Sequence, residues 1–339
     1  MQRVNRSRSA TWVAVLGTAL WAMTFAAEAE PSSPHFQLEQ LAEGVWAAIA
    51  TPGEYAICNM GIIDLGADVV LFDAGQSPEA ATDLAAAAQR LTGRAPTILV
   101  YSHGHNDHVR GATALAPDTV VIGTAGIRDD MIEDEKSAAE DAADIGTKLW
   151  LYRQYEAWDA RAGPAGEARF WRAYMQAVAE TGRKYKARLP TRFIEGGTMV
   201  LSGPRRKVVL DELSGHTKSD VVALLHEDHV VFAGDLPFVR HHPFLGDSPG
   251  SAKMLHALDA LRAEAPARYV PGHGAVAGVE AIESMSEYVS TLRGLVAETK
   301  RRGLTEDWLA GRSPPPQYSS WWFGRFFPSN IKAIFDEAN

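Results

Sequence analysis

The amino-acid sequence predicts an α/β protein, a four-layer αββα sandwich with a helical insertion. Apolar, strand-like runs alternate with helix-like segments from residue 36 to residue 124, and this pattern resumes after residue 192. Such alternation is typical of sheets that are covered by helices. The segment between the two halves, about residues 125–190, is charged and helical in composition, which predicts an insertion.

The first half begins with strands and then alternates helices with strands. Residues 36–72 contain apolar runs separated by the turn signals EG and LGAD. The stretch PEAATDLAAAAQRL at 78–91 starts with proline, has an alanine-rich interior and is followed by Gly93, all of which predict a helix. TILVYS then predicts a buried strand, VRGATALA a helix and TVVIG a further strand.

The insertion is rich in large aromatic side chains, and RAGPAGE should break it into two or more helices. Two interpretations of these rings are open. In one, the rings dock the helices on the core, as the apolar stripe of an amphipathic helix does, and in the other they wall a substrate pocket as part of a lid. The two roles are compatible with each other. The residues are Trp150, Tyr152, Tyr155, Trp158, Phe170, Trp171 and Tyr174.

The second half again runs from strands to helices. RFIEGGTMVLSG, KVVLDELSG and DVVALLHEDHVVFAGDL predict strands, with HEDH as an exposed turn. A helix at 251–264, a strand ending in RYVPGHG and a long helix to about residue 302 follow, so the main domain spans 36–300. The aromatic and proline-rich residues 301–339 predict a strap packed across the body, because so many exposed rings would favour aggregation.

Residues 1–29 have the layout of a secretory signal peptide. Three arginines precede an apolar run that is short for a bilayer span, and residues 27–29 form an A-x-A arrangement. We therefore expect a periplasmic or secreted protein with no stable membrane insertion after cleavage. An uncleaved N-terminal anchor is the alternative.

Composition narrows the class of partner. With 46% hydrophobic and 22% charged residues the chain can bury a full core, and its formal net charge is −9. This charge argues against nucleic acid as a partner, because phosphate binding usually needs a basic surface, and we expect a small-molecule partner instead. The single cysteine, Cys58, lies in an apolar stretch and predicts a buried small residue rather than a nucleophile.

The stretch VYSHGHNDHVRG concentrates four potential metal ligands directly after a predicted strand. Beyond the end of a strand the side chains splay around a common point, so the first two histidines can reach one ion while the other two residues turn towards a second. Imidazole and carboxylate without thiolate suit zinc-like divalent metals. The four residues are His103, His105, Asp107 and His108.

Three later residues of ligand type share this setting. His216 in LSGHTKSD, Asp235 in VVFAGDL and His273 in YVPGHG each lie where an apolar strand stops, and each has a glycine beside it. Glycine permits close approach of the backbone to a site. We therefore expect these residues to gather with the first cluster at one edge of the fold.

HGHNDH followed by GH, AGD and PGHG, in this order over roughly residues 40–300, resembles the metallo-β-lactamase superfamily. Asp73 in VLFDAG matches the first motif of that family, and the resemblance implies that it orients a metal ligand. Two zinc ions are implied, with iron or manganese as alternatives. The first ion would be held by His103, His105 and His216, the second by Asp107, His108 and His273, and both by Asp235.

The implied chemistry is hydrolysis. Two cations about 3.5–4 Å apart can share a water and lower its pKa towards 7, so that hydroxide forms at neutral pH and attacks a polarised carbonyl or phosphorus. Asp107 is the predicted catalytic residue, because it can orient the nucleophile or carry its proton as well as bind metal. We therefore expect hydrolysis of an ester, lactone, thioester or amide-type bond.

Two features of the sequence, Asp235 and the predicted signal peptide, indicate which enzymes of the family the chain resembles most. Zinc β-lactamases usually carry Cys or Ser at this position, whereas many other hydrolases of the family keep the aspartate. Export disfavours the intracellular thioesterases and tRNA-processing members. The alternatives are β-lactamase activity, phosphotriesterase-like activity or a mono-iron, persulfide dioxygenase-like oxygenase. A non-catalytic metal-binding protein is least favoured, because all seven ligand positions are present.

A loop beside the site is predicted just after Asp235, in FVRHHPFLGDSPG. Arg240, His241 and His242 in this loop are possible substrate contacts. Hydrogen bonds that stabilise the loop are an equally good interpretation, since polar loop residues near sites commonly serve either purpose.

Overall fold

The structure is a computed structural model in which residues 33–159 and 166–337 are described. The predicted signal peptide at residues 1–29 lies outside the described residues, as do most of RAGPAGE and the side chains of Tyr152, Tyr155 and Trp158.

The first sheet has seven strands in sequential order, antiparallel from β1 to β4 and parallel from β4 to β7. The parallel strands β4, β5 and β6 are continuous apolar runs, as expected where both faces of a sheet are covered, whereas the edge strand β7 is not. The strands are β1 Phe36–Ala42, β2 Val45–Ala50, β3 Met60–Asp64, β4 Val69–Phe72, β5 Ile98–Val100, β6 Val120–Gly123 and β7 Arg192–Phe193.

The second sheet has five strands in the order β12-β11-β10-β9-β8, and only β11 and β12 run parallel to each other. The HEDH turn between β10 and β11 leaves His226 and His229 exposed, as predicted. The strands are β8 Thr198–Ser202, β9 Lys207–Leu213, β10 Asp220–Leu225, β11 Val230–Phe238 and β12 Arg268–His273.

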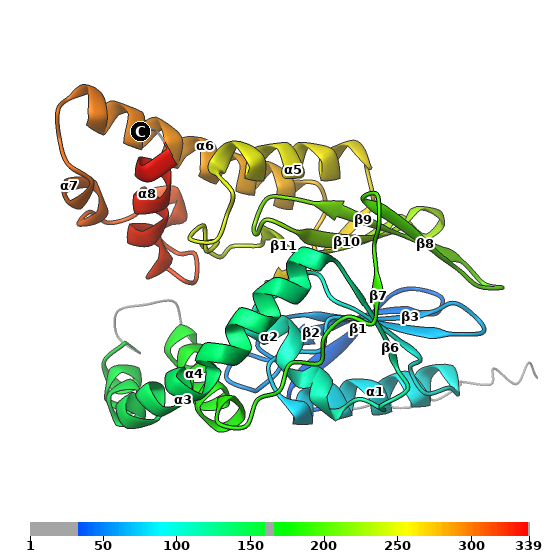
Figure 1. Cartoon of the computed structure of the whole chain (residues 1–339). Helices are drawn as coiled ribbons and strands as arrows, with labels where there is room; N and C mark the ends of the chain where they lie inside the picture. The colour runs from blue at the N-terminus through cyan, green and yellow to red at the C-terminus, as the bar shows by residue number, and fades with distance from the viewer. Residues whose placement is uncertain (1–32, 160–165, 338–339) are drawn as a thin grey trace, which may run out of the picture. The chain divides into compact units, whose positions relative to one another are not determined.

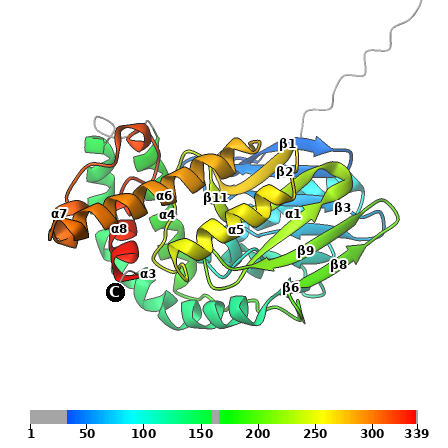
Figure 2. The same ribbon diagram turned by 90° about the horizontal axis from the view of Figure 1, so that it is seen from above.

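Helices cover the outer faces of both sheets, which confirms the predicted sandwich (Figure 1; Figure 2). Helix α1 (Pro78–Thr92) covers the first sheet, and its sequence explains its ends: the Ser77 hydroxyl accepts from the Ala80 amide, and Gly93 ends it at a φ of 73°. Helices α5 (Ser251–Ala263) and α6 (Glu280–Arg301) cover the second sheet.

The two sheets pack through apolar side chains. The rings of Phe72 and Phe232 lie 5.7 Å apart, one from each sheet. Gly61 allows this close packing, since a Cβ at that position would come within 2.5 Å of the Phe232 ring. The rigid sheet core holds the strand ends, and with them the site, in fixed positions.

The insertion consists of α3 (Ala125–Asp159) and α4 (Glu167–Gly182), which pack against each other. Gly182 makes the contact close, because a Cβ there would lie 2.5 Å from the carbonyl oxygen of Ala138. Phe170 and Trp171 of α4 join the same apolar cluster as Phe323 and Phe327 near the C-terminus.

The C-terminal residues pack on the body but are more helical than the predicted strap. Helix α7 (Glu306–Ala310), a 3₁₀ turn at Pro316–Tyr318 and α8 (Phe326–Glu337) follow α6. Helix α8 was not predicted, because aromatic and proline residues obscure its amphipathic spacing. In the structure its residues Ile331 and Ile334 are buried beside α6 and α7.

The predicted helix VRGATALA is also shorter than expected, because the chain forms one helical turn, α2 (Asn106–Val109), and then a 3₁₀ turn at Arg110–Ala114. Within the described residues, no helix is both long and apolar enough to cross a membrane.

Candidate metal centre

The first four ligand-type residues follow β5 directly. The chain leaves the sheet at Val100, and α2 begins at Asn106, so His103 and His105 lie on the turn while Asp107 and His108 lie on the helix. A hydrogen bond of 3.0 Å from the His108 amide to the His105 carbonyl closes the turn. All four side chains therefore start from one short segment at the end of a buried strand.

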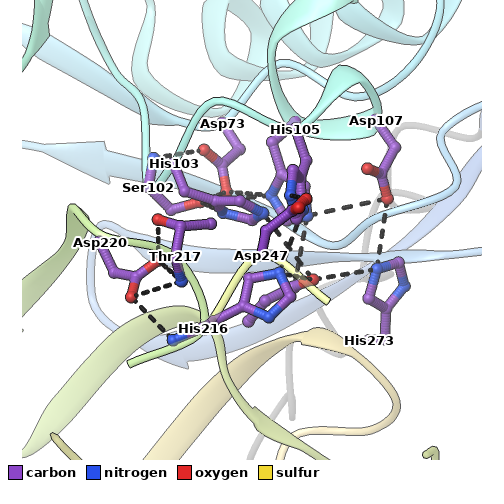
Figure 3. Close-up of polar contacts among 12 residues, drawn as sticks. Asp73, Ser102, His103, His105, Asp107, His216, Thr217, Asp220, Asp247 and His273 are labelled. Carbon is purple, nitrogen blue, oxygen red and sulfur yellow. Dashed lines mark hydrogen bonds and ion pairs between the residues drawn. The ribbon is translucent and has the colours of Figure 1, made fainter. Parts of the chain in front are cut away.

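The three later residues come to the same place from the second sheet. His216 lies in the loop between β9 and β10, Asp235 lies on β11 and His273 ends β12. Figure 3 shows His103, His105, Asp107, His216 and His273 pointing toward a common centre. The structure thus brings together all seven side chains that the sequence singled out.

These side chains form two groups, in each of which the potential ligand atoms lie within 4.8 Å of one another. The first group is His103, His105, His216 and Asp235, and the second is Asp107, His108 and His273.

Asp235 lies between the two groups. Its Oδ2 is 3.5 Å from Nε2 of His216 in the first group and 3.5 Å from Nε2 of His273 in the second. Its Oδ1 is 3.3 Å from Nε2 of His108. One carboxylate therefore faces both groups, which is the position required of a bridging ligand.

The residues present fit divalent metal ions. Nε2 of His103, Nε2 of His108 and Oδ1 of Asp235 are buried and have no hydrogen-bond partner. Buried polar atoms in proteins are normally satisfied, so three such atoms directed at one centre indicate a ligand. A donor set of imidazole nitrogen and carboxylate oxygen suits zinc and similar divalent ions.

The surroundings of His103 and His216 keep both imidazole rings neutral, which is the form that binds metal. Burial, together with neighbouring histidines, lowers the pKa of His103 well below its usual value, and burial lowers the pKa of His216 to about 3. Both rings are therefore neutral at pH 7. At His273 burial also opposes protonation, but Asp235 and Asp107 outweigh it and raise the pKa to about 9.

Asp73 lies beneath the second group, where the sequence placed it. Its Oδ2 is 2.8 Å from Nδ1 of His108, and its Oδ1 accepts the Ser102 amide at 2.7 Å. Asp73 has a φ of 61°, a left-handed conformation that is uncommon outside glycine and concentrates at functional sites. Ser102, which the sequence analysis missed, donates from its hydroxyl to Asp73 Oδ2 at 2.8 Å.

Two further carboxylates that the sequence analysis missed support the first group. Asp220 accepts hydrogen bonds from the amides of His216 and Thr217 and so fixes the loop that carries His216 (Figure 3). The sequence signal that could have indicated this role is the position of Asp220 four residues after His216. Asp247 Oδ2 lies 3.0 Å from Nε2 of His105. The two residues are 142 positions apart, and no local sequence pattern predicts their contact.

The three possible substrate contacts after Asp235 are absent from the lining of the cavity described below. His242 is buried, with Nδ1 2.9 Å from the Tyr288 hydroxyl and Nε2 3.2 Å from the Tyr318 carbonyl oxygen. His241 contacts Val239 O at 2.6 Å, and Arg240 is exposed near Ser320. The structure therefore supports the alternative interpretation, that these residues stabilise the loop.

A cavity of about 830 Å³ opens onto the centre. His105, Asp107, Asp235 and His273 lie at its base. Its walls come from the insertion and the C-terminal segment, which lie at the same end of the sandwich (Figure 1), and from residues of the two sheets and their loops. The apolar part of the wall consists of Ile57, Phe170, Trp171, Tyr174, Met175, Phe238, Phe244, Phe323 and Phe326.

The thiol of Cys58 is fully buried, as predicted. Burial is the main reason that its pKa rises to about 12, although the nearby His108 acts in the opposite direction. A thiol with this pKa is protonated at neutral pH and is a poor nucleophile.

Comparisons with known proteins agree with the fold. The structure of the sec-alkylsulfatase Pisa1 from Pseudomonas sp. is 16% identical with a TM-score of 0.63, over 89% of this chain and 50% of that one. The chain therefore spans about half the length of the alkylsulfatase. The metallo-β-lactamase FIM-1 from Pseudomonas aeruginosa, in its mono-zinc form, is 17% identical with a TM-score of 0.53, over 78% of this chain and 98% of that one.

A metallo-β-lactamase from Erythrobacter litoralis is 16% identical with a TM-score of 0.51, over 77% of this chain and 98% of that one. At these identities the similarity shows a shared fold. A search of the curated proteins finds no match. The family model described as "Metallo-beta-lactamase superfamily" matches residues 54–273, and the chain belongs to this superfamily.

Proposed function

We propose that the protein is an exported hydrolase with two metal ions, which cleaves an ester, lactone, thioester or amide-type bond in a small molecule with a large apolar group. The observation that carries the proposal is the position of Asp235, whose carboxylate faces both groups of ligand-type side chains. Superfamily membership and the similarity to a sulfatase and to β-lactamases support the same class of chemistry.

In this proposal the first metal is held by the group around His216 and the second by the group around His273, with Asp235 shared. Zinc fits the donor set best, and iron or manganese are alternatives. When bound, the ions would supply the Lewis acidity that activates water and polarises the bond to be cleaved.

Asp107 is the residue best placed to handle the proton of the attacking water. It lines the cavity, its side chain is 13% exposed, and its Oδ2 is 3.2 Å from Nε2 of His273. Burial opposes ionisation of Asp107, but His108 and His273 outweigh it and lower the pKa. The carboxylate is therefore ionised at neutral pH and can orient the water or accept its proton.

The cavity walls support an apolar substrate. Phe170, Trp171 and Tyr174 line the cavity, and Phe170 and Trp171 also pack on rings of the C-terminal segment. These two rings therefore support both interpretations of the insertion, whereas Trp150 is exposed and does not line the cavity. Such a wall binds an apolar group and excludes bulk water from the reacting bond.

The test is metal analysis combined with a substrate panel on the protein recovered after export. The panel holds a carboxylic ester, a lactone, a thioester, a phosphotriester, a β-lactam and, because of the alkylsulfatase similarity, a secondary alkyl sulfate. We expect two metal ions per chain and hydrolysis that a chelator abolishes. Full activity in metal-free protein, or one iron per chain with oxygen consumption, contradicts the proposal. The N-terminal sequence of the exported protein tests cleavage near residue 29.

A further inference from the structure

Arg325 is one of two basic side chains, with Lys218, that line the cavity in the described part of the chain, and it is the one that stacks on the aromatic wall. It belongs to the segment that leads into α8, and its guanidinium carbon lies 4.5 Å from the centre of the Trp171 ring on α4. Arg325 is exposed, and the described residues place no carboxylate within ion-pair distance of it. Its charge therefore faces the cavity with an aromatic ring as its neighbour.

The platform beneath Arg325 is fixed by one buried carboxylate. Glu167 Oε1 accepts hydrogen bonds from Trp171 Nε1 at 3.0 Å and from the Phe323 amide at 2.8 Å. The Trp171 ring beneath the guanidinium and the backbone amide of Phe323, two residues before Arg325, thus donate to the same oxygen of Glu167. The rings of Trp171 and Phe323, 5.0 Å apart, complete the contact. This arrangement holds the guanidinium over the cavity at little entropic cost to a ligand.

Three of the four described acidic side chains that line the cavity outside the metal groups have partners. In the described residues Asp134 is 2.7 Å from Arg110, Glu133 is 2.7 Å from Lys136 and Asp247 is 3.0 Å from His105. Among the described residues, Arg325 and Lys218 are the lysine and arginine side chains of the cavity lining for which no ion pair is found, and Arg325 is the one that rests on the aromatic wall.

We infer that Arg325 recognises an anionic group of the substrate, so that the substrate is an amphiphile with its scissile bond at the metal centre, an apolar body along the rings and a carboxylate, sulfate or sulfonate at Arg325. This inference rests on the proposed function for the scissile bond. A guanidinium suits the recognition because its planar N–H groups match the spacing of two oxygens of such a group.

The kinetic test compares two series of nitrophenyl esters that differ only at the far end of the acyl chain. One series ends in a carboxylate and the other in a methyl group, over a range of chain lengths. Arg325→Met keeps an unbranched side chain without the charge. Arg312→Met is the matched control, because Arg312 stacks on Trp308 at 3.9 Å and does not line the cavity.

We expect Arg325→Met to raise KM for the carboxylated esters about five- to tenfold, the range for a charge-assisted hydrogen bond at an exposed position. The kcat for these esters and both constants for the methyl-ended esters stay unchanged, as do all constants in Arg312→Met. Equal effects of Arg325→Met on both series indicate a merely structural role and overturn the inference.

A binding measurement separates this inference from the proposed function. Calorimetric titration of the zinc-loaded protein uses an alkylsulfonate and the alkanol of the same chain length. We expect Arg325→Met to weaken sulfonate binding about five- to tenfold and to leave alkanol binding unchanged. This outcome supports the role of Arg325 even if no ester is hydrolysed. Unchanged sulfonate binding refutes it even if esters are hydrolysed.

Discussion

Asp73 fixes the ring of His108 through a contact of 2.8 Å between Oδ2 and Nδ1, and so leaves Nε2 directed at the cluster formed by Asp107 and Asp235. Both residues are buried. A carboxylate at Nδ1 keeps the proton on that nitrogen, which frees the lone pair of Nε2 for a metal and raises its basicity.

Asp73→Asn tests this relationship. Asparagine tolerates the left-handed backbone at this position, but its amide can donate to Nδ1 and so favour the tautomer with a proton on Nε2. We expect the affinity of the second metal to fall about 10–100-fold, as is usual when a carboxylate behind a histidine ligand is lost. Competition with a chromophoric zinc chelator measures it. An affinity equal to that of the wild type contradicts the assigned role.

Asp107→Ala tests the catalytic carboxylate. We expect kcat at saturating metal to fall by about 100-fold or more, the usual contribution of a positioned acid or base. The loss of folding stability should be small beside the loss of turnover, although the substitution removes a carboxylate whose charge His108 and His273 stabilise against burial. Steady-state kinetics and thermal unfolding measure the two effects. A variant with full kcat shows that another group handles the proton.

Glu167→Ala tests the link between α4 and the C-terminal segment. The variant leaves Trp171 Nε1 and the Phe323 amide without their acceptor, and two unsatisfied donors should cost about 2 kcal/mol or more of unfolding free energy. Urea unfolding measures it. Glu167→Gln is the control, since it keeps an acceptor oxygen and should lose much less. Equal losses in the two variants show that the acceptor is unimportant.

His242 predicts a pH dependence of stability. Burial lowers its pKa to about 4, whereas an unfolded histidine titrates near 6.5. As the pH falls from 6.5 to 4, the unfolded chain binds a proton that the folded protein excludes, so this residue lowers the unfolding free energy by up to about 1.4 kcal/mol per pH unit.

His242→Gln removes this titration, and urea unfolding at several pH values should show a shallower loss of stability than in the wild type. The variant is expected to be less stable at pH 7, because it loses the fitted contacts with Tyr288 and Tyr318. The comparison therefore uses the slope against pH and not the absolute value. Identical slopes contradict the prediction.

The sandwich and the seven clustered side chains were predictable because both follow from local patterns. Strand ends in a layered fold meet at one edge, so ligand-type residues placed after apolar runs converge. Contacts between distant segments were not predictable in this way. Asp247 reaches His105 from a loop that carries no motif, and Arg325 reaches Trp171 only because α8 packs near α4.

For the loop after Asp235 the sequence left two interpretations open, substrate contact and stabilisation of the loop. The direction of a loop side chain depends on the tertiary core, so only the structure could favour one of them. The ring of His242 points into the interior, where its two nitrogens form hydrogen bonds with the Tyr288 hydroxyl on α6 and the Tyr318 carbonyl oxygen. Nothing in the local sequence distinguishes these two outcomes.

The burial of Cys58 gives the protein a built-in reporter of local opening. Because this is the one sulfhydryl of the chain and it lies beside His108, a thiol-reactive dye can attach only to molecules whose interior has opened next to the second metal group. The rate of labelling then measures how often the structure around Cys58 opens. Metal ions that bind the closed state would slow the labelling in proportion to their occupancy.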